Sequence, residues 1–525
     1  MATRAIGLAS GCEAARPSAC RLVRMVVSRQ AGRVMQDYRM LIGGEWCEAA
    51  DGASFTSINP YSGEEWARFP RAGAADVDLA ARAAYAAFTE GDWPRWTATQ
   101  RGAALVRLAG LIADEAGRLA EIEVRDNGKL MAEMSNQCRY MANWYAYYGG
   151  LADKVEGLVP PIDKPGVVNM VHYEPLGVCA CITPWNSPLL LLAWKIAPAL
   201  AAGNTVVVKP SEYTSASTLE LVRLIEAAGI PPGVVNVITG FGEEAGMPLV
   251  THPLVRKVAF TGGEQAGRAI NQAAAGDFKK VTLELGGKSP NIVFEDADLE
   301  AAVPGAVSGI FAASGQTCIA GSRLLLQDGI YDAFLDRLVE MARAAKLGDP
   351  MDPETNISPV ATAAQHEKIL AYIDIARAEG ATCLLGGRAA RPEGSEGYFV
   401  EPTIFTDVRN DMRIAQEEVF GPVLSVLRFS DEDEAVAIGN DVLYGLAAGV
   451  WTNDLTRALR MSRRLQAGTI WVNTYRSTSY TTPFGGYKRS GLGRENGSDA
   501  IKEYLQPKSI WLAEPKAVEN PFIRR

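Results

Sequence analysis

Histidine is scarce in this chain, which has only three copies in 525 residues: His172, His252 and His366. Each stands alone in the sequence, so a metal site built from several histidines is not expected. The scarcity of imidazole also leaves cysteine and carboxylate side chains as the candidates for nucleophilic and acid–base catalysis.

Cysteine is also sparse, and its eight copies show none of the spacing that zinc sites use. Scattered thiols in a long chain are typical of a reducing compartment rather than of a disulfide-bonded secreted protein. This pattern predicts a cytoplasmic protein. The eight are Cys12, Cys20, Cys47, Cys138, Cys179, Cys181, Cys318 and Cys383.

An excess of basic charge is missing as well, because the formal net charge is −9 and the isoelectric point about 5.2. A nucleic-acid partner is therefore not expected, whereas a small-molecule substrate is expected. The sequence also lacks a long, uninterrupted hydrophobic run. Between residues 176 and 208 only Lys195 is charged, but Pro184, Pro188 and Pro198 divide the stretch. A membrane-spanning helix needs about 20 apolar residues in a row, so none is predicted.

The first 36 residues differ from the rest of the chain. Residues 1–35 contain six arginines and a single acid, Glu13. Such a segment is typical of a mitochondrial transit peptide, which would change the predicted location. The alternative, which we favour, is a disordered or dispensable extension, or coding sequence ahead of a true start at Met35 or Met40.

The remaining chain predicts an α/β fold. From residue 177 to 287, apolar strands alternate with helices, as in a doubly wound parallel sheet. Ser187 and Pro188 are expected to begin one of these helices. Ligands of such sheets bind at the carboxyl ends of the strands. The expected strands are 178–182, 205–208, 234–238, 257–261 and 281–285.

A second α/β segment is predicted from 287 to about 487, ending in a buried strand at 469–472. Residues 155–161 and 167–173 are expected to pair, either as an excursion that joins another subunit or as an ordinary surface hairpin. A further candidate pairing strand covers 501–505 and 509–512. The helices expected in the second segment are 300–314, 331–345, 364–379 and 454–465.

Together these segments predict an α/β fold with a doubly wound parallel-sheet domain, a second α/β domain and a small β arm that suits oligomerisation. We assign residues 37–152 and 176–286 to the first domain and 287–487 to the second. Residues 153–175 and 488–525 form the arm and the C-terminal tail. A hairpin at 38–48 and helices near 76–88, 99–124 and 133–148 complete the first domain.

One thiol has surroundings suited to chemistry. Cys318 lies in Phe311-Ala-Ala-Ser-Gly-Gln-Thr-Cys-Ile-Ala-Gly-Ser-Arg323, among small residues that let a main-chain N–H and a substrate carbonyl approach the sulfur. Glu284, between Leu283 and Leu285, is the candidate base. From these residues alone, a small buried cysteine without a catalytic role is the alternative for Cys318.

Seven motifs closely resemble those of the aldehyde dehydrogenase superfamily in order and spacing, over residues 37–515. The resemblance is to the NAD-dependent, hydrolytic branch that does not acylate coenzyme A. The motifs are Pro184-Trp-Asn186, Lys209-Pro-Ser-Glu212, Phe260-Thr-Gly262, Leu283-Glu-Leu-Gly-Gly-Lys-Ser-Pro290, Gly315-Gln-Thr-Cys318, Glu417-Glu-Val-Phe-Gly-Pro422 and Pro483-Phe-Gly-Gly-Tyr-Lys-Arg-Ser-Gly491.

The resemblance implies that an aldehyde is oxidised to the carboxylic acid with NAD and water. Cys318 would attack the aldehyde carbon, and the Asn186 amide with the Cys318 main-chain N–H would stabilise the oxyanion of the thiohemiacetal. Hydride transfer would leave a thioester, for which Glu284 would activate the hydrolytic water. Lys195 and Glu495 are further candidates for moving protons, and the alternative for Lys195 is to bond main-chain carbonyls.

The resemblance also implies that the first domain is the NAD-binding domain and the second the catalytic domain, and it implies where NAD binds. Lys209 and Glu212 would hold the adenosine ribose, and because a carboxylate repels a 2′-phosphate, NAD is expected over NADP. Gly263 stands where many members have serine, and the charge of Glu264 beside it is expected to weaken pyrophosphate binding. The other implied contacts are Trp185, Gly262 and Gly267 to the pyrophosphate, and Glu418 and Phe420 to the nicotinamide ribose and ring.

The aldehyde itself is not determined by the motifs. Arg476, on a loop rich in hydroxyl groups, favours a polar or carboxylate-bearing aldehyde, unless it is a solvated loop cation. A CoA-acylating semialdehyde dehydrogenase, against which Glu284 argues, and a catalytically silent structural member are the alternative functions. A homodimer or homotetramer is expected. The substrate-pocket positions implied are Ser187, Leu190, Leu191, Trp194, Thr317, Ile319, Arg476 and Thr478.

Overall fold

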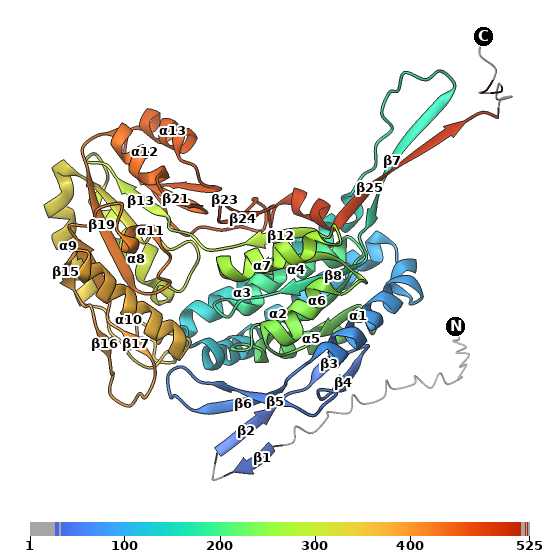
Figure 1. Ribbon diagram of the computed structural model, residues 1–525, viewed down its shortest axis with the longest axis horizontal. Helices are drawn as coiled ribbons and strands as arrows, with labels where there is room; N and C mark the ends of the chain where they lie inside the picture. The colour runs from blue at the N-terminus through green and yellow to red at the C-terminus, as the bar shows by residue number, and fades with distance from the viewer. Residues whose placement is uncertain (1–26, 31–32, 516–519, 521, 523–525) are drawn as a thin grey trace, which may run out of the picture.

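The computed structural model describes residues 27–30, 33–515, 520 and 522 (Figure 1). Most of the predicted N-terminal extension lies outside these residues, as does the end of the tail. Two strands nevertheless precede residue 38, where a disordered extension is predicted. β1 (Val27–Gln30) pairs with β2 (Arg33–Asp37), and β2 runs parallel to β6 (Glu65–Pro70). Strand pairing uses main-chain groups, so an arginine-rich composition does not prevent it.

The predicted doubly wound sheet has eight strands, in the order β24-β12-β11-β8-β9-β10-β3-β4, of which β24 is Gly491–Leu492. Its five central strands are parallel to one another, and each is at most a residue or two from its predicted bounds. The predicted hairpin of β3 (Met40–Ile42) and β4 (Glu45–Cys47) adds an antiparallel edge. The central strands are β8 (Val178–Ile182), β9 (Thr205–Lys209), β10 (Val235–Val237), β11 (Val255–Thr261) and β12 (Lys280–Glu284).

Helices cover both faces of this sheet (Figure 1). Along β8, Cys179 and Cys181 pack into one core while Val178, Ala180 and Ile182 pack into another, as side-chain alternation requires. Burial on both faces explains why these strands are uninterrupted apolar runs. The first core is closed by α2 (Ala98–Asn127), α3 (Met131–Leu151), α4 (Pro188–Ala201) and α5 (Ala216–Ala227), and the second by α1 (Ala74–Thr89), α6 (Met247–Thr251) and α7 (Glu264–Ala275).

A second sheet has seven strands, in the order β15-β18-β19-β14-β13-β21-β22, and only β15 (Thr382–Leu385) runs antiparallel. The prediction that 469–472 is a buried strand is wrong in its burial. β22 (Thr469–Val472) lies at the edge of the sheet, where Trp471 is buried and Val472 is exposed. The parallel strands before it are β13 (Pro290–Val293), β14 (Arg323–Gln327), β18 (Thr403–Thr406), β19 (Val423–Phe429) and β21 (Ala447–Trp451).

The helices of the second half also lie close to their predicted bounds, and they pack against both faces of the second sheet. None of the helices in the described ranges is both long and apolar enough to cross a membrane. The helices are α8 (Leu299–Phe311), α9 (Tyr331–Arg343), α10 (Ala363–Ala378), α11 (Arg413–Gln416), α12 (Glu432–Asn440) and α13 (Leu455–Arg464).

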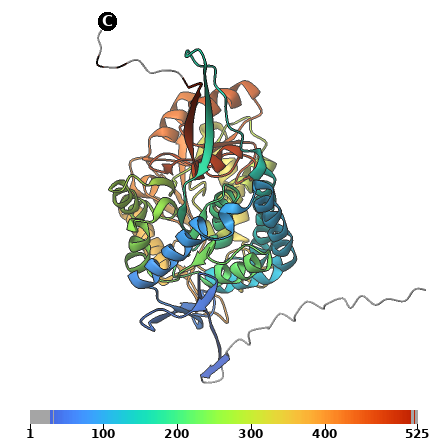
Figure 2. The same cartoon turned by 90° about the vertical axis from the view of Figure 1, so that its right-hand side faces the viewer.

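A two-stranded ribbon projects from the body of the molecule (Figures 1 and 2). It pairs β7 (Val167–Pro175) with β25 (Leu505–Ala513) along their whole length. The predicted pairing of 155–161 with 167–173 is reduced to one bridge, between Leu158 and Val171. Two consecutive prolines at 160 and 161 lack the N–H groups that a ladder needs, and β25 occupies the other edge of β7. Residues 498–504 form a 3₁₀ helix, where 501–505 was predicted as strand.

The crossing of α2 and α3 requires glycine, which makes it a test of the packing. A Cβ at Gly102 would lie 2.4 Å from the main-chain oxygen of Gly149, whereas at Gly110 on the same helix it would meet no heavy atom within 4 Å. We expect Gly102→Ala to lower Tm, with a loss of about 1–3 kcal/mol. Gly110→Ala should leave Tm unchanged or raise it, because alanine favours a helix by up to about 1 kcal/mol. Equal shifts of the two variants in thermal denaturation would contradict this packing.

Candidate active site

Cys318 follows a strained turn at the end of α8. Ala313 (φ 55°), Ser314 (φ 51°) and Gly315 (φ 70°) all adopt the left-handed region. Gly315 is needed for a second reason, since a Cβ there would lie 2.0 Å from the main-chain oxygen of Gly421. Backbone strain of this kind persists only where the surroundings fix it, and it is common at functional sites.

Two buried polar side chains fix this turn. The Ser314 hydroxyl donates to the main-chain oxygen of Ser358 (2.8 Å) and accepts from its N–H (3.0 Å). The Gln316 amide accepts from the Ala361 N–H (2.9 Å) and donates to the Pro359 oxygen (3.2 Å). The sequence gives no local signal of these roles, because Ser358, Pro359 and Ala361 all lie more than 40 residues away in the chain.

Cys318 lies where two cavities meet, and Asn186 and Leu191 line both of them. The Asn186 side-chain amide donates to the main-chain oxygen of Gln316 (3.1 Å), two residues before Cys318. The first cavity is also lined by the predicted residues Trp185, Gly262, Glu284, Glu418 and Phe420. All eight predicted substrate positions line the second, which is also lined by Lys129, Asn136, Gln137, Tyr140 and Phe484.

A third cavity adjoins the first, with Trp185 and Gly262 in the lining of both. Lys209 and Glu212 lie along it, 3.3 Å apart from Nζ to Oε2. Together the first and third cavities follow the carboxyl ends of β8, β9 and β11, where a doubly wound sheet binds its ligands. The buried Thr183 hydroxyl also lines the third cavity and has no hydrogen-bond partner among the described residues.

Gly267 departs from its predicted place. It lines none of these three cavities, and its N–H already donates to the Gly263 oxygen (3.0 Å). A Cβ there would lie 2.5 Å from a methyl carbon of Leu285. The structure therefore gives Gly267 a packing function, close approach of α7 to the sheet, in place of a phosphate contact.

The charge of Glu264, which is expected to weaken pyrophosphate binding, is partly offset by neighbouring cations. Its carboxylate forms ion pairs with Arg268 (2.7 Å) and Arg489 (3.3 Å) and accepts a hydrogen bond from the Tyr444 hydroxyl (3.1 Å). Arg268 lies one turn along α7 from Glu264, at the i,i+4 spacing that pairs opposite charges. Arg489 is more than 200 residues away in the chain, so the sequence alone does not pair it with Glu264.

Removal from water dominates the electrostatics of the reactive groups. Burial, with the charges of Glu418 and Glu284 adding to it, raises the pKa of the Cys318 thiol to about 12. Burial, and next the charge of Glu495, raises the pKa of Glu284 well above its usual value. Both Glu284 oxygens are buried and lack a hydrogen-bond partner among the described residues.

A buried ion pair lies within electrostatic range of Glu284. The Lys195 ammonium donates to Glu495 (2.6 Å) and to the Thr261 hydroxyl (2.6 Å), and both charged side chains are almost fully buried. Lys195 therefore bonds a carboxylate and a hydroxyl rather than main-chain carbonyls. The charge of Lys195 opposes the rise in the pKa of Glu284.

Two residues of α10 line the first cavity but are not predicted from the sequence as site residues. The Gln365 amide donates to the main-chain oxygens of Val419 and Phe420 (both 2.9 Å), which supports Phe420 at a φ of 60°. Lys368 lines the same cavity, and its charge lowers the pKa of Glu418, which burial raises. Both lie on a helix that carries no recognisable motif.

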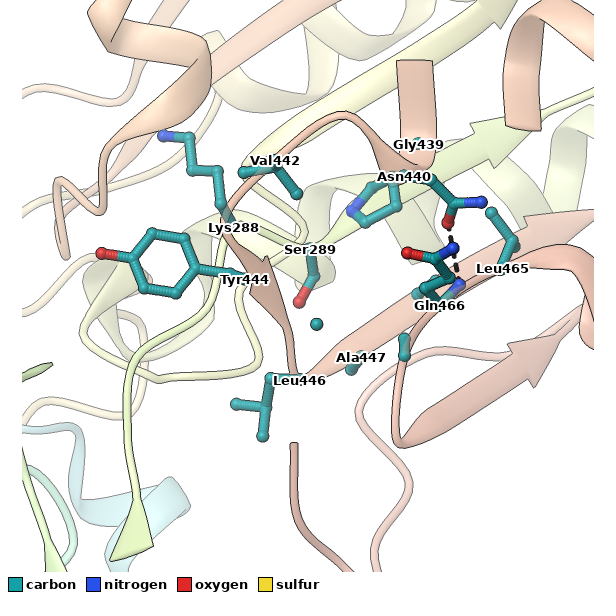
Figure 3. A pocket seen from close by; sticks show the side chains of 14 residues that line it. Lys288, Ser289, Gly439, Asn440, Val442, Tyr444, Leu446, Ala447, Leu465 and Gln466 are labelled. Carbon is teal, nitrogen blue, oxygen red and sulfur yellow. Dashed lines mark hydrogen bonds between the residues drawn. The ribbon is translucent and has the colours of Figure 1, made fainter. Parts of the chain in front are cut away.

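A fourth, much smaller cavity lies beside β13 (Figure 3). Lys288 and Tyr444 extend along one side of it, and Asn440 lies on the other, where its side-chain oxygen accepts from the Gln466 N–H (2.8 Å). Its volume of about 10 Å³ is that of a single water molecule, so it is too small for a substrate.

The sequence profile of the aldehyde dehydrogenase family matches residues 46–510. The chain belongs to the aldehyde dehydrogenase family. This confirms the predicted α/β fold class and the enzyme class, an NAD-dependent oxidoreductase that converts an aldehyde to the carboxylic acid.

Relatives of known structure or activity cover nearly the whole chain. A (Z)-2-((N-methylformamido)methylene)-5-hydroxybutyrolactone dehydrogenase of Acinetobacter baylyi is 47% identical, over 94% of this chain and 100% of its own. A betaine aldehyde dehydrogenase of Bacillus subtilis is 44% identical, over 92% and 99%. The structure of a Staphylococcus aureus betaine aldehyde dehydrogenase in complex with NAD⁺ superimposes with a TM-score of 0.91 at 40% identity, over 93% and 97%.

The raised pKa of Cys318 predicts how its reactivity depends on pH. Below a raised pKa the thiol is neutral, so the reactive thiolate increases as pH rises. In the enzyme without cofactor, we expect the rate of Cys318 alkylation by iodoacetamide to grow about tenfold per pH unit from about pH 7 to about pH 9, without a plateau. Peptide mass spectrometry measures this rate, with Cys318→Ala as the control. A plateau below about pH 8 would contradict the prediction.

Proposed function

We propose that Cys318 is the nucleophile of this aldehyde dehydrogenase, that Asn186 stabilises the oxyanion and that Glu284 activates the hydrolytic water. The observation that supports these roles is that all three residues line the first cavity. Cys318 and Asn186 also line the second, so they lie where the predicted cofactor site meets the predicted substrate site. Glu284 has two free, desolvated oxygens there, as a base awaiting a water molecule would have.

In this proposal Glu284 accepts the proton of the Cys318 thiol and releases it through the Lys195–Glu495 pair, and the thiolate adds to the aldehyde carbon. The new oxyanion accepts hydrogen bonds from the Asn186 amide and the Cys318 N–H, each contributing about 3 kcal/mol to the transition state. The bound nicotinamide supplies the hydride acceptor. Glu284 then takes a proton from the water that attacks the thioester, and the Lys195–Glu495 pair is positioned to pass a proton onward.

We also propose that NAD lies along the first and third cavities, as the complex of the Staphylococcus aureus relative supports. The residues fit it: Lys209 and Glu212 present an ammonium and a carboxylate to the ribose hydroxyls, and the unpartnered Thr183 hydroxyl is free for a further hydrogen bond. The carboxylate of Glu212 favours NAD over NADP by repelling a 2′-phosphate. The remaining contacts are Trp185 and Gly262 at the pyrophosphate, and Glu418 and Phe420 at the nicotinamide ribose and ring.

Glu284 separates this function from the alternatives. A CoA-acylating enzyme has no need of a base for hydrolysis, and a silent structural member has no need of the three residues together. The free thiols of the described chain suit a reducing compartment, and we propose the cytoplasm.

Substitution of the proposed base tests the proposal. We expect Glu284→Gln to keep a burst of about one NADH per site and to lower the steady-state rate by about 10²-fold or more, because hydrolysis loses its base. Cys318→Ala should form no NADH, and Glu295→Gln, at an exposed position outside the three cavities, should behave as the wild type. Rapid-mixing absorbance of NADH measures both phases. An unchanged steady-state rate in Glu284→Gln, or acceleration of the wild type by coenzyme A, would overturn the assignment.

We propose that the two sheets are the cores of the cofactor and catalytic domains and that the β7–β25 ribbon joins copies of this chain as a homodimer or homotetramer. A lone two-stranded ribbon is only marginally stable in water. Val168 and Leu512 lie opposite each other on one face of it, 50% and 51% exposed. A second copy that covers this face would bury both side chains.

The oligomer can be tested by charging this face. We expect Val168→Lys with Leu512→Lys to shift the protein towards monomers in multi-angle light scattering, because ammonium groups cannot be buried without partners. Leu455→Lys, at an exposed position of α13 away from the ribbon, should keep the wild-type mass. A wild-type mass for the ribbon variant would count against the ribbon as the interface.

A further inference from the structure

Lys129 is a buried cation that faces the substrate cavity without an anionic partner. It follows α2, is 2% exposed, and lines the same cavity as Cys318. The only hydrogen bond of its ammonium among the described residues is to the Ser187 hydroxyl (3.1 Å). An ammonium has three N–H donors, so two remain unpaired.

The acidic residues nearby act on Lys129 through space and form no ion pair with it among the described residues. No carboxylate oxygen of the described residues lies within 4.0 Å of its ammonium, and the charges of Glu133 and Glu123 act on it only from farther away. One Glu133 oxygen is instead bound by the Ala313 N–H (2.8 Å). Burial lowers the pKa of Lys129 to about 8, which still leaves most of it charged near neutral pH.

A second cation lines the same cavity. Arg476, at a φ of 67°, donates to the Ser308 main-chain oxygen (3.1 Å) and forms no ion pair with any described residue. No aspartate or glutamate lines this cavity, which has a volume of about 310 Å³. A buried cation without a partner is costly, so two cations and no acid point to an anion that enters with the substrate.

The Ser187 side chain adds a donor at this point. Ser187 stands at the N-terminus of α4, but its hydroxyl does not cap the helix and accepts from Lys129 instead. Its own O–H is left free to donate to a substrate oxygen. Lys257 offers a contrast, because its buried ammonium bonds the Thr282 hydroxyl (3.2 Å) and faces the Tyr504 ring (4.7 Å) rather than a cavity.

We propose that the substrate is an aldehyde that also bears a carboxylate, which is held by Lys129, Arg476 and the Ser187 hydroxyl while its formyl carbon meets Cys318. This inference rests on the proposed function of Cys318 and specifies its substrate class. A quaternary-ammonium aldehyde would bring like charges together in this cavity, so betaine aldehyde, named for two relatives, should be a poor substrate here.

Three aldehydes separate charge from size: 4-oxobutanoate, its neutral analogue 4-oxobutanamide, and cationic betaine aldehyde. In the wild type we expect kcat/KM to be at least about tenfold higher for the anion than for the amide, and lowest for the cation. In Lys129→Met that preference should fall to within about threefold, because KM rises more for the anion than for the amide. Lys257→Met, a buried lysine outside the cavity, should keep the wild-type ratio. An unchanged ratio in Lys129→Met, or no preference in the wild type, would overturn the inference.

Binding without turnover separates this inference from the catalytic assignment. Calorimetry on Cys318→Ala should show tighter binding of the product-like dianion succinate than of succinamate, and Lys129→Met in that background should remove the difference. If this holds while no aldehyde is oxidised by the wild type, the anion site stands and the proposed catalytic roles fail. If the aldehydes are oxidised but succinate binds no tighter than succinamate, the catalytic roles stand and the anion site fails.

Discussion

Desolvation of the reactive groups is the constraint on which the site depends. Glu284 ends β12 of the first sheet, and Cys318 lies on the loop that precedes β14 of the second. Neither sheet alone would keep water from both groups, so the raised pKa values of the thiol and the carboxyl exist only when the two are packed together. Packing of the two sheets therefore favours the neutral form of both groups over the charged form.

The C-terminal segment takes part in this enclosure as well as in the ribbon. Gly491 of β24 (Gly491–Leu492) pairs with Glu284, and Glu495 exchanges both main-chain hydrogen bonds with Phe484. Glu495 in turn holds Lys195, and its charge raises the pKa of Glu284. Residues assigned from the sequence to an arm and tail thus complete the surroundings of the proposed base before the chain continues into β25.

The sequence predicts well those features of the fold and the site that depend on local residue patterns. The parallel strands are uninterrupted apolar runs, and Cys318, Glu284 and Asn186 lie in motifs at or near strand ends, so their convergence follows from the topology of the sheet. What it does not predict depends on distant partners. β7 pairs with a strand more than 300 residues away, and Lys129 becomes notable only when folding places it beside Ser187 and leaves it without a carboxylate.

The charges around Cys318 divide by cavity. Acidic side chains, Glu418 and Glu284, lie on the cofactor side and raise the pKa of the thiol, whereas Lys129 lies on the substrate side and lowers it. A cation that enters the first cavity therefore favours the thiolate, and an anion that enters the second disfavours it. The pKa of the Cys318 thiol therefore depends on what occupies each cavity. An anionic aldehyde reacts best when the cofactor already occupies the first cavity. The same division keeps the substrate carboxylate away from the carboxylate that must later act as a base.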